Sequence, residues 1–135
     1  MPLERVNPDT LCPPVLNLYS QVVVSSAARW AFISGQVALD AQGQLVGADH
    51  ASQALQAFRN LRLALRAVGA DPQNITKMTL YVVDHRPELI EPIFAAGRVA
   101  FEGEWPLTAS VFIGVHRLGL PQWLIEIDAV AALDP

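Results

Sequence analysis

Five short segments of the chain are rich in apolar and β-branched residues, which predicts that they form strands. They are Tyr19–Ser25, Trp30–Leu39, Ile75–Val83, Ser110–Val115 and Trp123–Ala132. Val, Ile, Phe and Trp favour extended conformations, which supports this reading. Gly35 interrupts the second segment, and a glycine inside a strand marks a bulge or a close backbone approach. We expect the first two segments to form a hairpin that turns at Ser25–Arg29.

Two other segments repeat apolar residues at three- and four-residue spacing, which predicts helices. The first is Asp49–Val68, with Asp49 as its N-cap. The second is Pro87–Phe101, which contains Pro92. Proline inside a helix removes a backbone hydrogen bond and clashes with the preceding turn. We therefore expect the regular helix to begin near Glu91, after a separate turn.

The order of these elements is strand, strand, helix, strand, helix, strand, strand, which predicts an α+β fold within a single domain, residues 1–135. Two helices with one apolar stripe each would cover one face of a single sheet. The strands supply few charges for the other face, so we expect that face to be apolar and to be covered by other copies of the chain. Residues 1–14 are rich in proline and are expected to be irregular.

Composition narrows the class of protein. The chain is 52% hydrophobic and 16% charged, which excludes disorder and favours a large core or a buried subunit interface. Its net charge of −4 disfavours nucleic acid as a partner. No apolar run is long enough to span a membrane. The single cysteine, Cys12, excludes an intrachain disulfide framework, so we expect a cytoplasmic protein.

Side chains that carry chemistry are sparse. His50, His85 and His116 are far apart and lack the ligand spacing of a metal site, so no metal is expected. The chain has neither a phosphate-binding glycine loop nor a nucleophile elbow. Glu126 is the exception, because it lies in an otherwise apolar strand where an unpaired carboxylate is costly to bury. It could be a general base, or it could be a structural acceptor for backbone N–H groups or an interface cation.

Three separated parts of the chain resemble one known family. They are the segments YSQ at Tyr19–Gln21 and ISGQ at Ile33–Gln36, the helix end AVGA followed by ITKMT at Ile75–Thr79, and LIEIDAV at Leu124–Val130. In this order, and over nearly the whole chain from about Pro14 to Ala132, they resemble the RidA/YjgF family of reactive intermediate deaminases.

The resemblance implies a chorismate-mutase-like α+β fold and a homotrimer, with three sheets forming a central barrel and the helices outside. Clefts between subunits of this family bind small ligands that carry a carboxylate. Its active members hydrolyse enamines and imines to ketoacids and ammonia, without a metal or organic cofactor. Carried over residue by residue, the cleft would be formed by a set of six residues in which Glu126 positions the attacking water: Tyr19, Ser34, the backbone at Gly35, Thr108, Ser110 and Glu126.

The chain departs from the family at the group that binds the substrate carboxylate. Deaminating members carry an arginine two residues after a proline, and here the segment Pro106–Thr108 places Thr108 at that position. Ser110 replaces a cysteine, and Pro92 stands where an asparagine often contacts the ligand. Threonine cannot replace a bidentate guanidinium, and the loss is worth on the order of 1.5–3 kcal/mol of ligand binding. We therefore expect weak or absent activity on standard 2-imino acids, which an arginine at position 108 would raise if it fits.

Two functions remain open on the sequence. The first is a deaminase or hydrolase of an imine-like small molecule, which is uncharged or is bound by another cation such as Arg117, Lys77 or Arg98. The second is a non-catalytic trimer that binds a metabolite or a partner enzyme. An endoribonuclease, a label also used for this family, fits poorly with the acidic charge balance and the lack of a basic stripe.

Overall fold

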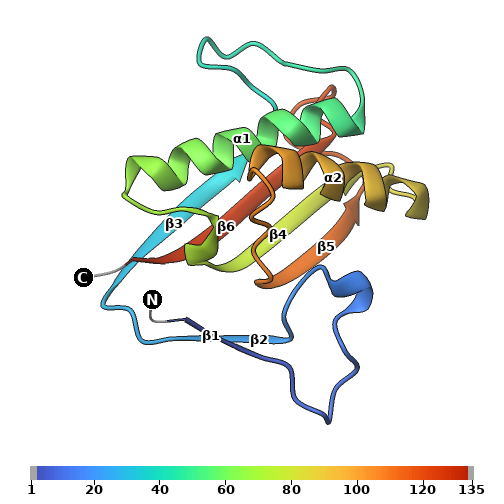
Figure 1. Ribbon diagram of the computed structural model, residues 1–135. Helices are drawn as coiled ribbons and strands as arrows, with labels where there is room; N and C mark the ends of the chain where they lie inside the picture. The colour runs from blue at the N-terminus through green and yellow to red at the C-terminus, as the bar shows by residue number, and fades with distance from the viewer. Residues whose placement is uncertain (1–2, 134–135) are drawn as a thin grey trace.

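A four-stranded mixed sheet is the centre of the fold (Figure 1). The computed structural model describes residues 3–133. The strand order is β3-β6-β4-β5, and the strands are β3 (Arg29–Gln36), β6 (Ile125–Leu133), β4 (Ile75–Val83) and β5 (Ala109–Val115). β6 pairs antiparallel with both β3 and β4, whereas β4 and β5 are parallel. The predicted α+β class is confirmed.

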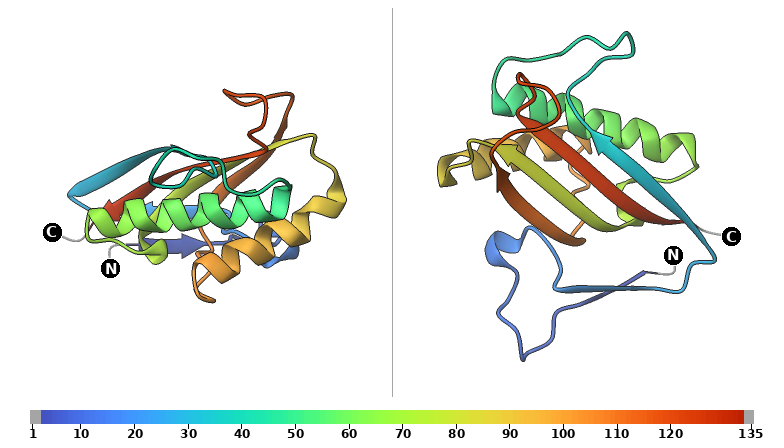
Figure 2. Two further views of the ribbon diagram at one scale, coloured as in Figure 1. Left: turned by 90° about the horizontal axis from the view of Figure 1, so that it is seen from above. Right: turned by 180° about the vertical axis from the view of Figure 1, so that it is seen from behind.

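Two α-helices, α1 (His50–Ala67) and α2 (Ile90–Ala100), pack side by side on one face of this sheet (Figures 1 and 2). Asp49 caps α1 as predicted, since its side chain accepts a hydrogen bond from the backbone N–H of Ser52 at 2.8 Å. The core between the layers is made of fully buried apolar side chains, including Phe58, Leu61, Leu65, Leu80, Ile93, Ile125 and Ile127. No helix within residues 3–133 is long and apolar enough to cross a membrane.

The start of α2 shows how the chain accommodates Pro92. A separate 3-10 turn, η3 (Pro87–Leu89), precedes the helix, which begins at Ile90, one residue from the expected start at Glu91. Pro92 is therefore the third helical residue. The first four N–H groups of a helix have no partner within it, so a proline there costs no hydrogen bond.

The sheet face away from the helices, which the right-hand view of Figure 2 shows in front of them, is more polar than the sequence suggested. On the central strands, Tyr81 lies opposite Glu126 and Thr79 lies opposite Asp128. The apolar part is at the edge strands, where Phe32 is 80% exposed. The expectation of an apolar face thus holds at its edges and is wrong at its centre, because strand alternation places both acidic residues of β6 on this face.

The N-terminal part of the chain forms a separate two-stranded ribbon of β1 (Leu3–Val6) and β2 (Val22–Ser25). The expected hairpin of β2 and β3 is therefore wrong, since β2 pairs with β1 and β3 pairs with β6. The expected irregular N-terminus is wrong for the residues of β1, while Met1 and Pro2 lie outside the described residues. Arg5 attaches the ribbon to the main body by donating to the Leu107 carbonyl at 3.1 Å. A local apolar pattern predicts a strand but does not identify its partner.

Gln53 joins two loops to the first turn of α1. It is 1% exposed. Its Nε2 donates to the carbonyls of Gly47 at 3.2 Å and Gln122 at 3.0 Å, and its Oε1 accepts from the N–H of Leu124 at 2.9 Å. The amide therefore satisfies three buried or partly buried backbone groups at the end of the sheet where β6 begins.

Replacing Gln53 with leucine is expected to lower the free energy of unfolding by about 3 kcal/mol, because three backbone groups lose their partner and the burial of unpaired polar groups is costly. Urea unfolding at fixed protein concentration would measure the change. The matched control is Gln42→Leu on the exposed loop, which should stay within about 0.5 kcal/mol of wild type. An equally small effect at Gln53 would show that water replaces the amide.

Candidate functional site

The first part of the candidate site is a close contact between Gly35 and Glu126. The register of β3 against β6 shifts between Ile33 and Gln36, which is the β-bulge that the glycine predicts. A Cβ atom added to Gly35 would overlap the Glu126 carboxylate. Only glycine therefore lets the strand backbone and the carboxylate lie this close together. The bulge and the close backbone approach, which were the two roles expected for Gly35, are both present.

Glu126 lies half-buried on the open face of the sheet, directly opposite Tyr81 in the register of β6 and β4. None of the ion pairs found within residues 3–133 includes it. Ser34 immediately precedes Gly35 and is exposed on the neighbouring edge strand. A carboxylate in this position is free to accept a proton or to hold a water molecule.

Tyr81 lies beside this carboxylate as a neutral hydrogen-bond donor. Its hydroxyl donates to Asp128 Oδ2 at 3.2 Å. Burial raises the pKa of Tyr81, and the charge of Asp128, the hydrogen bond to it and the charge of Glu126 raise it further. The phenol therefore keeps its proton at neutral pH and does not act as a base.

The second part of the candidate site is an apolar cavity of about 180 Å³ on the helix-covered side of β5. It lies between the turn η1 (Val15–Asn17), β5 and α2. Among the residues that line it are Leu18, Tyr19, Ile90, Phe94, Ser110 and Phe112. Tyr19 and Ser110, both predicted site residues, are thus brought together by the structure.

Thr108 lies two residues before Ser110 in the sequence, but its side chain does not line the cavity. Its side chain is 0% exposed, and its hydroxyl donates to the Ile75 carbonyl at 2.8 Å. Its own carbonyl accepts from the N–H of Ser20 at 3.0 Å. Both polar groups are therefore used to hold β4, β5 and the N-terminal segment together.

Within one chain, the six predicted residues form two groups at opposite edges of the sheet. Ser34 and Gly35 lie on the edge strand β3, with Glu126 beside them on the neighbouring strand β6, whereas Tyr19, Thr108 and Ser110 lie along β5 and the segment beside it. Because the order is β3-β6-β4-β5, the two edge strands are three strand spacings apart, or about 14 Å. The alternation of side chains also places Ser110 and Glu126 on opposite faces. A single chain does not bring the two groups together.

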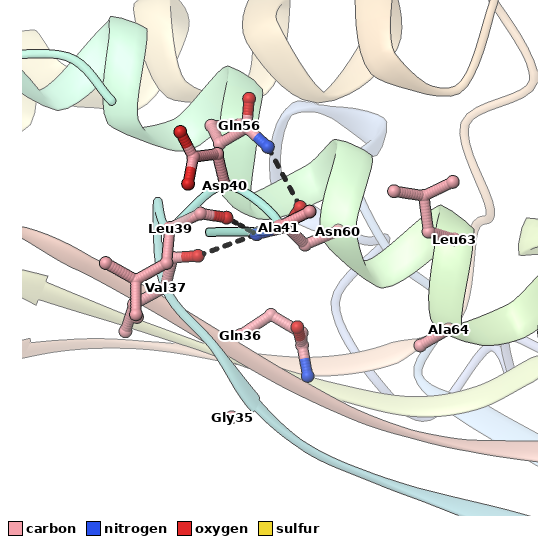
Figure 3. Close-up of a pocket in the computed structure, with 10 residues that line it drawn as sticks. All are labelled: Gly35, Gln36, Val37, Leu39, Asp40, Ala41, Gln56, Asn60, Leu63 and Ala64. Carbon is pink, nitrogen blue, oxygen red and sulfur yellow. Dashed lines mark hydrogen bonds between the residues drawn. The ribbon is translucent and has the colours of Figure 1, made fainter. Parts of the chain in front are cut away.

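A wider groove of about 560 Å³ adjoins Gly35, between the end of β3 and α1 (Figure 3). Gln56 donates to Asn60 Oδ1 at 2.9 Å, and Asn60 in turn donates to the carbonyls of Val37 at 2.9 Å and Leu39 at 2.7 Å. This chain of amides holds the loop after β3 against the helix. Sequence reasoning missed both amides, although two amides four residues apart on a helix are a visible signal.

Arg117, Lys77 and Arg98, the cations that the sequence offers for binding a carboxylate, do not line the cavity around Tyr19. Arg98 forms an ion pair with Glu91 at 3.6 Å on the surface of α2. Lys77 is exposed at the start of β4, and Arg117 is exposed in the connection between β5 and β6. Within residues 3–133, no three side chains of His, Cys, Asp or Glu are grouped as metal ligands.

Comparison with known proteins places this fold and these residues in a family. Residues 11–133 match the family described as Endoribonuclease L-PSP. A 2-iminobutanoate/2-iminopropanoate deaminase from Mus musculus is 32% identical over 98% of this chain and 94% of its own. A Rid-family protein of unknown function from Yersinia pestis is 41% identical, with a TM-score of 0.89 over 98% of this chain and 100% of that structure. TdcF from E. coli, solved with bound serine, is 25% identical with a TM-score of 0.68 over 95% and 94% of the two chains. The chain therefore belongs to the Endoribonuclease L-PSP family, which is the RidA/YjgF family that its sequence resembles.

Proposed function

We propose that the protein hydrolyses an imine or enamine to a carbonyl compound and ammonia, at a site that two copies of the chain form together. The observation that carries this proposal is the Glu126 carboxylate, which lies without an ion-pair partner against the backbone of Gly35. Relatives with the same fold are named 2-iminobutanoate/2-iminopropanoate deaminases.

The need for two copies follows from the position of the two half-sites. The β3 and β5 edges are about 14 Å apart in one chain. Head-to-tail association brings unlike surfaces together, and it closes into a ring when the rotation between copies is suitable. A ring of three would place the β5 edge of one copy beside the β3 edge of the next. It would also cover Phe32, which is 80% exposed, together with the other apolar residues at the edges of the open face.

The chemistry requires a base, a water molecule and a donor for the leaving nitrogen. Glu126 takes a proton from water as the oxygen attacks the imine carbon and returns it to the imine nitrogen, which gives a neutral tetrahedral carbinolamine. The carboxylate then takes the proton of the new hydroxyl group and passes it to the nitrogen as the C–N bond breaks, so the C=O bond forms and ammonia leaves. The hydroxyls of Tyr19 and Ser110 are neutral donors that can hold the substrate.

One observation favours the alternative of a non-catalytic trimer that binds a metabolite or a partner enzyme. Thr108 occupies the position of the family's carboxylate-binding arginine and is fully buried, so nothing charged reaches a ligand from there. A protein that only binds a ligand would retain the cleft without needing a charged contact from position 108. Hydrolysis by the wild-type protein decides between the two functions.

The first expected outcome concerns assembly. Sedimentation equilibrium at micromolar concentration should give the mass of a trimer of the 14.7 kDa chain. Phe32→Glu should shift the protein toward monomers, because a charge would then be buried in the interface. Val99→Glu is the control, since Val99 is 62% exposed on α2, and it should leave the mass unchanged. A stable wild-type monomer would remove the basis for a shared site.

The second outcome concerns Glu126. Imines would be generated by an amino-acid oxidase or an amine oxidase, and their decay would be followed with and without the protein. Glu126→Gln should lower any catalysed rate at least ~100-fold, as expected for the loss of a general base. The control is Glu88→Gln, at a surface carboxylate on the turn before α2, which should leave the rate unchanged. Equal activity of the two variants would exclude Glu126 as the base.

The third outcome concerns Thr108, and its burial reverses the sequence-based expectation that arginine would raise activity. Thr108→Arg removes the hydrogen bond to Ile75 and forces a long cation into the core, so it should lower the free energy of unfolding by about 3 kcal/mol or more. It should add no hydrolysis of 2-iminobutanoate. Thr108→Ser, which keeps the hydroxyl, is the control. A stable and more active arginine variant would show that the side chain can turn outward into a cleft.

A further inference from the structure

We propose that the cavity beside Ser110 selects the substrate, and that it accepts a flat apolar group about the size of a phenyl ring and rejects a carboxylate. This inference deepens the proposed function. The part that concerns which imines are hydrolysed rests on that function, whereas the part that concerns binding does not. The substrate class would then be neutral imines of aldehydes or ketones with an aromatic or branched aliphatic substituent, rather than imines of 2-keto acids.

The size and walls of the cavity support an apolar occupant. Its volume is about 180 Å³, close to that of engineered apolar cavities of about 150 Å³ that bind benzene. Phe94 and Phe112 are stacked, with ring centroids 5.8 Å apart and planes at 22°, and His85 lies edge-on to Phe112 at 4.8 Å. These contacts hold an aromatic wall in place before any ligand enters, which lowers the entropic cost of binding.

The polar groups in the cavity are neutral. Tyr19 and Ser110 are the lining residues with side-chain polar atoms, and no Lys, Arg or His is among them. Arg5 reaches the segment before Thr108, but its guanidinium donates to the carbonyls of Leu107 and Gln73. A carboxylate in this cavity would lose its hydration without gaining a cation, which is strongly unfavourable.

The hydroxyl groups of Tyr19 and Ser110 can donate hydrogen bonds to an imine nitrogen or a carbonyl oxygen. The Tyr19 oxygen accepts from the N–H of Val15 at 3.2 Å, so its own proton remains available for a ligand. The Ser110 hydroxyl is 3.4 Å from the Thr108 carbonyl, a long contact that a ligand acceptor can replace. A neutral acceptor attached to an apolar ring would satisfy both features of the cavity.

The mouth of the cavity is apolar as well. Figure 1 shows the turn η1 beside β5, and this turn contributes Val15 and Leu16 to the lining. Both side chains are largely exposed, at 59% and 69%. Leu16 and Asn17 have φ values of 56° and 54°, a left-handed conformation that is unfavourable for leucine. The chain thus keeps two aliphatic side chains at the entrance at a conformational cost, where they would contact an apolar ligand.

The binding test compares phenylacetamide with phenylacetate, which share ring and length and differ in charge at neutral pH. Isothermal titration calorimetry on the assembled wild-type protein should show phenylacetamide binding at least tenfold more tightly. Ser110→Leu and Ile90→Phe, which fill the cavity from two elements, should each weaken phenylacetamide binding at least tenfold. Val99→Phe is the control, because Val99 is 62% exposed on α2 outside this cavity, and it should bind as wild type does.

The kinetic test uses a matched pair of imines with the same benzyl group. An amine oxidase acting on phenethylamine gives the neutral imine, and an amino-acid oxidase acting on phenylalanine gives the imine that carries a carboxylate. The protein should accelerate hydrolysis of the neutral imine with a kcat/KM at least tenfold higher.

The outcomes separate the two proposals. Tight phenylacetamide binding that the cavity variants weaken, with neither imine hydrolysed, would support the subsite and overturn the proposed function. Phenylacetate binding equal to or tighter than that of phenylacetamide, no binding of either probe, or binding unaffected by Ser110→Leu and Ile90→Phe would each overturn the subsite. A higher kcat/KM for the imine with the carboxylate would also overturn it.

Discussion

The contact between the Glu126 carboxylate and the backbone of Gly35 is the interaction on which the proposed chemistry depends. A bulge in β3 and the absence of a Cβ atom allow it, because any larger residue at position 35 would overlap the carboxylate. The glutamate lies on the open sheet face, one strand in from the β3 edge, where none of the described cations pairs with it. A carboxylate that lies against backbone without a counter-ion is suited to orient water.

The width of the sheet imposes the second constraint. Glu126 lies on β6 beside the β3 edge, and the rest of the proposed site lies along β5 at the other edge of the four-stranded sheet, so one copy of the chain can present only half of the proposed site at each edge. An activity that needs both halves must then depend on assembly, and stability and function become linked through the same surface. The polar centre of the open face fits this arrangement, since Tyr81 and Asp128 satisfy each other there and leave the apolar edges for contact between copies.

Thr108, at the position where the sequence resemblance predicts an arginine, is part of the packing of this chain. The threonine hydroxyl satisfies the Ile75 carbonyl where β4 begins, and the backbone of Thr108 holds the N-terminal segment through Ser20. A buried hydroxyl with a partner stabilises this corner, whereas a guanidinium there would need both space and a counter-ion. The neutral cavity next to it is consistent with a ligand that needs no cation.

The sequence by itself determined the elements whose signals are local. The periodicity of apolar residues predicted α1, and the residue type of Asp49 predicted its cap. Pro92 predicted the start of α2 after a separate turn, a run of apolar and β-branched residues predicted the bounds of β4, and Gly35 predicted the bulge in β3. The ordered family segments predicted the fold. Only the tertiary structure decided that β2 pairs with β1, that Thr108 is buried, and that Ser110 and Glu126 lie on opposite faces of the sheet. Helix periodicity and capping act within a few residues, whereas strand pairing joins residues about 100 positions apart in β3 and β6. A strand's pattern shows which residues share a face, but the partner strand and its register decide which face that is.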